Sequence, residues 1–438
     1  MTLTTPITVV RGRFLDIQKT VSQAQDIIDQ VRYIEDGVLI AKQGQIRWFG
    51  SWDDAQAHLP ANVEIQHYPE QLIIPGMIDT HIHFPQTEMV GAYGEQLLSW
   101  LNTYTFPTEI QFQDPSYAQK IAEFFIQELL KNGTTTALVF CTVHPESVDA
   151  LFEAAAQQQM RLIAGKVMMD RHAPEALCDT AESAYNDSKA LIGKWHGQGR
   201  ALYAITPRFA PTSTPEQLER AGQLKAEFPD VYVHTHLSEN KDEIAWVKDL
   251  FPEQKGYLDV YHHYGLTGNR SVFAHCVHLE DAEWQCMHET DSAIAFCPTS
   301  NLFLGSGLFP LKKTWQQQVK VGLGTDIGAG TSFSLLQTVN EAYKVQQLQG
   351  DKLSAFESLY HATLGGAKAL DLDNKLGNFN VGKEADFVVL NLKPTALQEL
   401  RQSRAKSLED SLFALFTMGD DRNIEATYIY GQKAYSQS

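Results

Sequence analysis

Eight apolar segments of strand length recur through the middle of the chain, and helical patterns lie between several of them. These segments cover residues 77–83, 134–140, 161–169, 201–206, 231–236, 271–276, 293–297 and 319–324. Eight strands with intervening helices are what a parallel (β/α)8 barrel of the α/β class requires. An open, doubly wound sheet would show the same alternation, so the alternation alone does not decide between the two folds.

Two of the helical patterns have recognisable ends. Residues 117–130 carry apolar side chains at helical spacing and stop at Lys131-Asn-Gly133, which suits a C-terminal cap. Thr214-Pro-Glu-Gln217 is typical of a helix start, with a capping residue followed by proline at the first position.

The two ends of the chain differ from the middle because both are rich in short β-type segments. Such segments lie at residues 7–10, 37–41, 44–50, 385–391 and 426–431. We therefore expect a small β-sandwich domain formed by residues 1–72 together with residues 377–438. Residues 73–376 would form the barrel as the catalytic domain.

The ends of four predicted barrel strands carry residues that can bind a metal. They read Asp79-Thr-His81-Ile-His83, His234-Thr-His236-Leu-Ser-Glu239, Ala274-His275-Cys276 and Gly324-Thr-Asp326. Side chains alternate along a strand, so His81 and His83 share a face and can reach one cation. A lone histidine at a strand end is more often structural. Four such features, all at the end of a barrel where active sites lie, predict one site.

Charge and cysteine usage exclude several other classes of protein. The formal net charge is -18, and lysine and arginine are not clustered as nucleic-acid binding requires. The five cysteines are widely spaced and include no C-x-x-C pair, which disfavours a disulfide framework or a thiolate zinc site. The first residues lack the pattern of a signal peptide, and no apolar run approaches a membrane span. We expect a cytoplasmic protein that binds neither nucleic acid nor membrane.

Two motifs resemble the amidohydrolase superfamily. Pro75-Gly-Met-Ile-Asp-Thr-His-Ile-His83 is similar to its metal-binding signature, and Gly382-Lys-Glu-Ala-Asp-Phe-Val-Val-Leu390 is similar to the strand that returns to its β domain. The resemblance covers nearly the whole chain. It implies a metal held by His81, His83, His236 and Asp326, with His275 close to the metal-bound water.

The residues also indicate how many metal ions to expect. Binuclear relatives bridge two ions with a modified lysine at the end of strand four, whereas this strand ends in Thr206-Pro-Arg208-Phe209, and Lys166 lies within strand three. A guanidinium stays protonated and cannot act as a ligand. Three imidazoles and one carboxylate suit one zinc ion per subunit with a position left for water, although iron would also tolerate them.

Glu239, three residues after His236, is a natural proton shuttle for an activated water. His275 and Asp326 would hold and polarise that water. The alternative for Glu239 is an acidic residue in the first turn of a helix, where the macrodipole favours negative charge.

Further segments resemble the guanine deaminase family, a mononuclear branch of the superfamily. They are residues 83–86, 97–109, 165–170, 206–211 and 296–301. This resemblance implies hydrolysis of guanine to xanthine and ammonia by a homodimeric enzyme. Gln86, Arg208 and Phe209 would contact the purine, and the purine would lie beside four residues of the metal site, namely His83, His236, Glu239 and Asp326.

The chemistry of these contacts is compatible with guanine. An arginine fork reads the adjacent O6 and N7 acceptors of guanine well, and an aromatic ring stacks on a nucleobase. The alternatives are a surface salt bridge for Arg208 and ordinary core packing for Phe209. His234 lies on the same strand face as His236 and either supports the metal site or packs in the core. Residues 97–107 either close over the ligand or form a plain packing helix.

Other functions remain to be distinguished. A relative that removes an amino or chloro group from a triazine, a pterin or a modified guanine would keep the same metal ligands. A non-catalytic barrel scaffold would lose them, whereas this chain has all five of His81, His83, His236, His275 and Asp326. A second deaminase fold uses H-x-E with P-C-x-x-C; the chain has H-x-E at residues 144–146 and 278–280 but no P-C-x-x-C.

Overall fold

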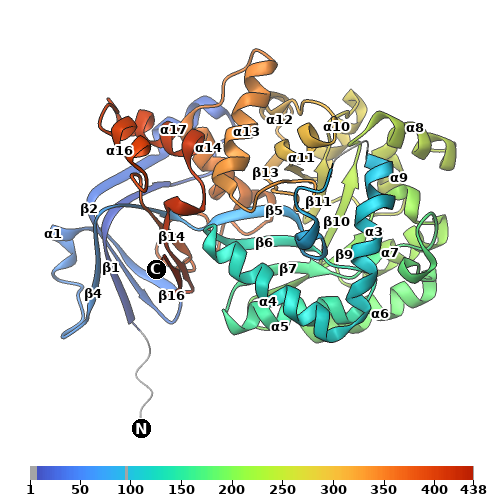
Figure 1. Cartoon of the computed structure of the whole chain (residues 1–438), viewed down its shortest axis with the longest axis horizontal. Coiled ribbons are helices and arrows are strands. Elements are labelled where there is room, and N and C mark those ends of the chain that lie inside the picture. Colours follow the sequence, from blue (N-terminus) through green and yellow to red (C-terminus); the bar gives the residue numbers. More distant parts are fainter. Residues whose placement is uncertain (1–6, 94–96, 438) are drawn as a thin grey trace, which may run out of the picture.

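The computed structural model describes residues 7–93 and 97–437, which form a parallel barrel and a separate sheet beside it (Figure 1). The barrel strands are β5 (Met77–His83), β6 (Thr134–Phe140), β7 (Arg161–Gly165), β8 (Val167–Met168), β9 (Ala201–Pro207), β10 (Tyr232–Leu237), β11 (Ser271–His275), β12 (Ala293–Phe296) and β13 (Lys320–Leu323). Neighbouring strands pair in parallel in the order β5-β6-β7-β9-β10-β11-β12-β13, with the short β8 on β9.

The first and last strands of this order lie side by side, so the barrel is nearly closed. The backbone N–H of Asp326, just after β13, donates to the carbonyl of His81 in β5 at 2.9 Å. The hydroxyl of Thr80 donates to the carbonyl of Leu323 at 2.9 Å. Closure confirms the predicted (β/α)8 barrel and excludes the open sheet. Every predicted strand segment contains a strand, but the segment 161–169 is split between β7 and β8 at Lys166.

Helices surround the barrel, as Figure 1 shows. The larger ones are α4 (Pro115–Lys131), α5 (Pro145–Gln157), α6 (Ala181–Trp195), α7 (Pro215–Glu227), α8 (Lys241–Leu250), α9 (Tyr257–His263), α10 (Asp281–Glu289), α12 (Leu311–Gln317), α13 (Leu335–Leu348) and α14 (Ala355–Ala362). Shorter helices are α2 (Leu97–Trp100), α3 (Phe106–Glu109), α11 (Pro298–Phe303) and α15 (Leu364–Ala369), the π-helix η3 (Leu101–Thr105) and the 3-10 helices η1 (Ala24–Gln30), η2 (Phe84–Met89), η4 (Ile110–Gln113), η5 (Glu175–Leu177) and η6 (Ala210–Thr212). Helix α1 (Trp52–Ala55) instead contacts β2 and β3 of the terminal sheet.

The two predicted helix ends are confirmed. Helix α4 ends at Lys131 with Gly133 two residues beyond, at φ +76°, a conformation that glycine adopts without strain. At the start of α7, the Thr214 hydroxyl accepts the backbone N–H of Gln217 at 3.2 Å.

The two ends of the chain form one seven-stranded sheet. Its strands are β1 (Ile7–Ile17), β2 (Val31–Lys42), β3 (Gln45–Ser51), β4 (Ile65–Pro75), β14 (Phe387–Leu390), β15 (Ile424–Ile429) and β16 (Gln432–Ser436), in the order β16-β15-β14-β4-β1-β2-β3. Phe14 and Leu39 from one half share an apolar cluster with Phe387 and Tyr428 from the other, so one core joins the two ends of the chain. Helices α16 (Ala396–Gln402) and α17 (Leu408–Met418) and the turn η7 (Asp421–Asn423) precede β15.

Partly buried ion pairs join the segment before β14 to the amino ends of the barrel strands β7 and β9. Arg161, at the start of β7, donates from Nε to Glu384 at 2.9 Å, and Arg200 donates to Asp386 at 3.1 Å. The chain passes directly from β4 to β5 at Gly76, where a Cβ atom would lie 2.0 Å from the Thr135 hydroxyl. The proposed domain limits at residues 72 and 377 stay a prediction. Among the described residues, no helix is long and apolar enough to cross a membrane.

Candidate active site

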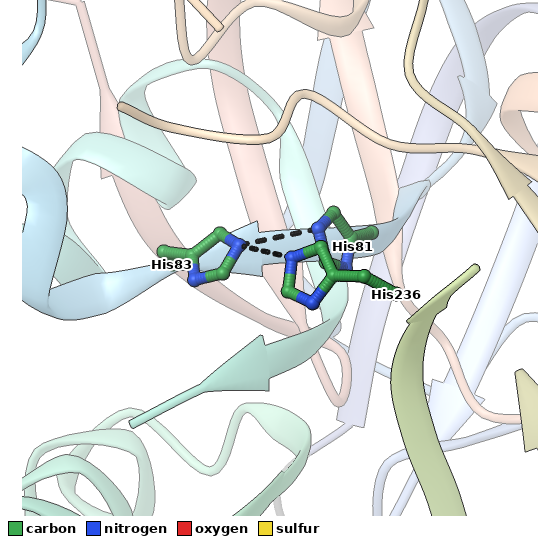
Figure 2. A group of neighbouring side chains, drawn as sticks. All are labelled: His81, His83 and His236. Atoms are coloured by element: carbon green, nitrogen blue, oxygen red, sulfur yellow. Dashed lines mark hydrogen bonds between the residues drawn. The ribbon is translucent and has the colours of Figure 1, made fainter. Parts of the chain in front are cut away.

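Three histidine rings converge at the carboxyl ends of β5 and β10, and Figure 2 shows them facing one another. The Nε2 atom of His83 lies 3.2 Å from the Nε2 atoms of both His81 and His236. An Asp326 carboxylate oxygen, from the segment after β13, lies 3.1 Å and 3.2 Å from Nε2 of His81 and His83. The structure thus brings together all four predicted metal ligands.

The spacing of these atoms fits a tetrahedral ion. Ligand atoms about 2.0–2.1 Å from a tetrahedral zinc ion lie about 3.3 Å from one another, which agrees with the observed separations. Within residues 7–93 and 97–437, the groups that could hold a metal are two overlapping sets, one of His81, His83 and His236 and one of His81, His275 and Asp326. The donor set therefore fits a divalent metal ion.

Partners outside the cluster fix which nitrogen of each ring faces inward. His236 donates from Nδ1 to the backbone carbonyl of Arg208 at 2.7 Å, so its Nε2 keeps the lone pair that a metal needs. Nδ1 of His81 lies 2.8 Å from Nε2 of His234. If His81 Nε2 is a ligand atom, its Nδ1 carries the proton and donates a hydrogen bond to Nε2 of His234.

Burial keeps the ligand rings neutral, which is the form that binds metal. It lowers the pKa of His83 to about 3, and it lowers the pKa values of His81 and His236 as well. Burial opposes ionisation of Asp326, but His81, His83 and His275 outweigh it and hold the pKa of that carboxyl well below its usual range. The site therefore presents neutral imidazoles and one carboxylate.

Asp79 connects the strands that carry these ligands. Its carboxylate accepts the backbone N–H groups of His81 and Thr325, each at 3.1 Å, and also the Thr325 hydroxyl. Because His81 is on β5 and Thr325 directly precedes Asp326, this one buried carboxyl fixes both sides of the metal site. Burial raises the pKa of Asp79 to about 7.

Glu239 and His275 lie beside the ligand cluster. Glu239 Oε1 accepts the Ser306 hydroxyl at 3.0 Å, and its Oε2 lies 3.5 Å from Nε2 of His275. Burial, reinforced by negative Asp326, raises the pKa of Glu239 to about 8, so this carboxyl can hold a proton near neutral pH. His275 donates from Nδ1 to Asn301 Oδ1 at 2.9 Å, which turns Nε2 toward Glu239 and Asp326.

A pocket opens next to this cluster, and every predicted substrate-binding residue lines it. These are His83, Gln86, Arg208, Phe209, His236, Glu239 and Asp326, joined by His275 and Glu243. Leu97 and Trp100 of α2 and Leu101 of η3 also line the pocket. The segment 97–107, for which the sequence permits either a lid or a packing helix, therefore contacts the ligand-binding space. An apolar wall with a few convergent polar groups is typical of small-molecule sites.

The structure distinguishes between the alternatives that the sequence permits for Arg208 and Phe209. The salt bridge of Arg208 is buried rather than exposed, because its side chain is 3% exposed and pairs with Glu109 at 2.7 Å. Phe209 lines the pocket and also packs against Trp246, with ring centroids 6.3 Å apart, so it is part of both pocket and core.

Sequence reasoning missed three residues that support this site. Glu109 and Asn301 are the last residues of two segments, 97–109 and 296–301, that resemble the family. The resemblance therefore points to these positions but not to the roles of the two side chains. Glu243 accepts the backbone N–H groups of Glu239 and Asn240 at 3.0 Å and 3.1 Å. It forms a capping box with Asn240 at the start of α8, and this N-x-x-E pattern can be read from sequence.

The barrel, its metal-binding end and the returning sheet define the class of protein. The model of the amidohydrolase family matches residues 72–434, which is most of the chain. The chain belongs to the amidohydrolase family.

Comparison with individual proteins narrows the class. The chain is 62% identical over 429 residues to guanine deaminase of Escherichia coli (strain K12), covering 98% of both chains. The solved structure of E. coli guanine deaminase superposes with a TM-score of 0.96 at 60% identity, covering 99% of this chain and 100% of that one. Guanine deaminase from C. acetobutylicum, with guanine bound in its active site, matches with a TM-score of 0.88 at 31% identity, covering 98% and 100%.

Proposed function

We propose that the chain catalyses the hydrolytic deamination of guanine to xanthine and ammonia. The observation that carries this proposal is the convergence of four metal-binding side chains beside a pocket lined by Gln86, Arg208 and Phe209. The high identity to guanine deaminases over the full chain supports the same substrate.

We further propose that His81, His83, His236 and Asp326 hold one zinc ion per chain, with iron as the alternative. When bound, zinc supplies Lewis acidity that lowers the pKa of a water molecule to about 7. The resemblance also implies a cytoplasmic homodimer. Metal analysis of the purified protein tests the zinc content, and sedimentation tests the dimer.

In the proposed reaction, water adds to C2 of guanine while Glu239 accepts a proton from it and passes that proton to N3. The remaining hydroxyl proton then moves through Glu239 or Asp326 to the amino group. The C2–N bond breaks, ammonia leaves, and the added oxygen becomes the C2 carbonyl of xanthine. The hydrogen bond from Ser306 and the contact with His275 support this role, because they fix the Glu239 carboxyl at the edge of the pocket.

Arg208 and Phe209 orient the ring for this attack. The O6 and N7 acceptors of guanine lie across the ring from C2 and N3, so N–H groups of Arg208 on that edge would direct C2 toward Glu239. Phe209 would stack on the flat face. Adenine carries an amino donor in place of O6, which the arginine disfavours.

Steady-state assays with guanine, adenine, cytosine and an aminotriazine test the substrate directly. We expect guanine to have by far the highest kcat/KM. An absence of guanine turnover by the zinc-loaded protein would refute the assignment, and faster turnover of the aminotriazine would favour the other heterocycles.

A further inference from the structure

Glu109, the last residue of α3, uses both carboxylate oxygens to hold two residues that line the pocket. Arg208 donates from Nη1 to Oε2 at 2.7 Å, and Gln86 donates from Nε2 to Oε1 at 3.2 Å. The Glu109 side chain is only 1% exposed. Arg208 and Gln86 line the pocket whereas Glu109 does not, so the carboxylate lies behind the two residues that face the ligand.

We propose that Glu109 is a specificity-determining positioning residue, which sets the hydrogen-bond donors that Arg208 and Gln86 present to the O6/N7 edge of the purine. This inference rests on the proposed function and deepens it. Glu109 does not touch the substrate; it acts through the two side chains in front of it.

Gln86 is fixed at both ends of its amide group. Its Oε1 accepts the backbone N–H of Gly328 at 3.1 Å while its Nε2 donates to Glu109. The amide oxygen is thereby occupied by a backbone donor, and the amide nitrogen keeps one N–H for a ligand. Without the carboxylate, the amide could rotate and present its oxygen instead.

Glu109 holds the Arg208 side chain in position and also compensates its positive charge. Its guanidinium carbon lies 5.5 Å from the centre of the Phe106 ring and its side chain is buried, so the positive charge needs a buried partner. Pairing through Nη1 leaves other N–H groups of the fork for ligand acceptors. Glu109 thus balances the charge of Arg208 and leaves donors free.

The consequence is discrimination between purines. A fixed set of donors suits the O6 and N7 acceptors of guanine, whereas the six-position amino group of adenine would meet a donor. A wrong ligand that leaves the buried donors of a site without acceptors is rejected strongly.

Glu109→Gln tests the proposal because it keeps the shape and removes the charge. We expect KM for guanine to rise about tenfold or more, with kcat changed by less than about threefold and zinc content unchanged. Because adenine has no amino group at C2, its binding is measured as competitive inhibition of guanine turnover, and the ratio of the adenine inhibition constant to the KM for guanine should fall by a similar factor. Glu384→Gln is the matched control, since Glu384 is a carboxylate only 13% exposed that pairs with Arg161 at the amino end of β7, away from the pocket.

The double variant Glu109→Gln/Arg208→Ala separates positioning from general destabilisation. Because Glu109 acts partly through Arg208, the KM of the double variant should rise by less than the product of the two single-variant increases. Additive losses, or an unchanged KM in the single variant, would overturn the inference. So would a loss confined to melting temperature and active fraction. In each of these cases the wild type still turns over guanine; failure of the wild type to do so would instead refute the proposed function.

Discussion

The Nδ1 atom of His236 lies 2.7 Å from the backbone carbonyl oxygen of Arg208. One residue therefore serves both halves of the site, because the backbone of Arg208 orients a metal-binding ring while its side chain lines the purine pocket. The segment after β9 couples ligand geometry to substrate recognition. A side-chain change at this position should separate the two roles.

Arg208→Ala should weaken guanine binding and leave metal binding intact. The backbone carbonyl that holds His236 remains, whereas the donors for O6 and N7 are lost. We expect KM for guanine to rise by about 10-fold to 100-fold, since a bidentate contact of this type contributes about 1–3 kcal/mol. Kinetics and metal analysis of the same preparation check this; a lost metal or an unchanged KM would contradict it.

Glu239→Gln should retain metal and lose most turnover. The amide keeps the shape and can still interact with Ser306, but it cannot accept and deliver a proton. We expect kcat to fall by about 100-fold or more, in line with the contribution of general acid–base groups. The exposed Glu253→Gln is a control expected to behave as wild type. Near-normal turnover by Glu239→Gln would rule out the shuttle role.

His234→Ala should weaken zinc binding through His81. The variant removes the acceptor that lies 2.8 Å from His81 Nδ1, and loss of such supporting partners costs about 10-fold to 100-fold in metal affinity. His234→Gln retains an acceptor and should recover part of the affinity. Competition with a chelator measures the dissociation constant; equal constants for wild type and His234→Ala would show that His234 only packs.

Lys383→Met should change how stability depends on pH. Burial lowers the pKa of Lys383 to about 8 from its ordinary value of 10.5, and its amine donates to the Leu376 carbonyl at 3.0 Å. Between these two values the unfolded chain binds more protons than the folded one, so the free energy of unfolding rises with pH. The free energy of unfolding of the wild type minus that of the variant should therefore increase by roughly 1 kcal/mol per pH unit from pH 8 to 10. Urea unfolding at each pH measures it, and a constant difference would contradict it.

The barrel could be predicted because buried parallel strands read as continuous apolar runs. The main departure is the break at Lys166, whose buried amine pairs with Asp179 and interrupts the predicted third strand. Apolar content alone could not place this break, because Asp179 lies outside the segment and the pairing depends on tertiary structure.

The metal-binding set could also be predicted, because barrel topology brings the carboxyl ends of distant strands together. Apart from the capping pattern of Glu243, the contacts that support the metal ligands and the pocket could not be predicted. Glu109 and Arg208 are 99 residues apart in sequence, and no local pattern connects them. His234 remained ambiguous for the same reason, since strand alternation gives its face but not its contact with His81.

The most direct test of the account is a zinc titration of metal-free protein, with guanine consumption, xanthine and ammonia measured together. We predict that activity rises linearly and saturates at about one equivalent of zinc, with equimolar products, and that His236→Ala abolishes the saturable response. Full activity without added metal, or saturation only at about two equivalents, would contradict a single ion held by His81, His83, His236 and Asp326.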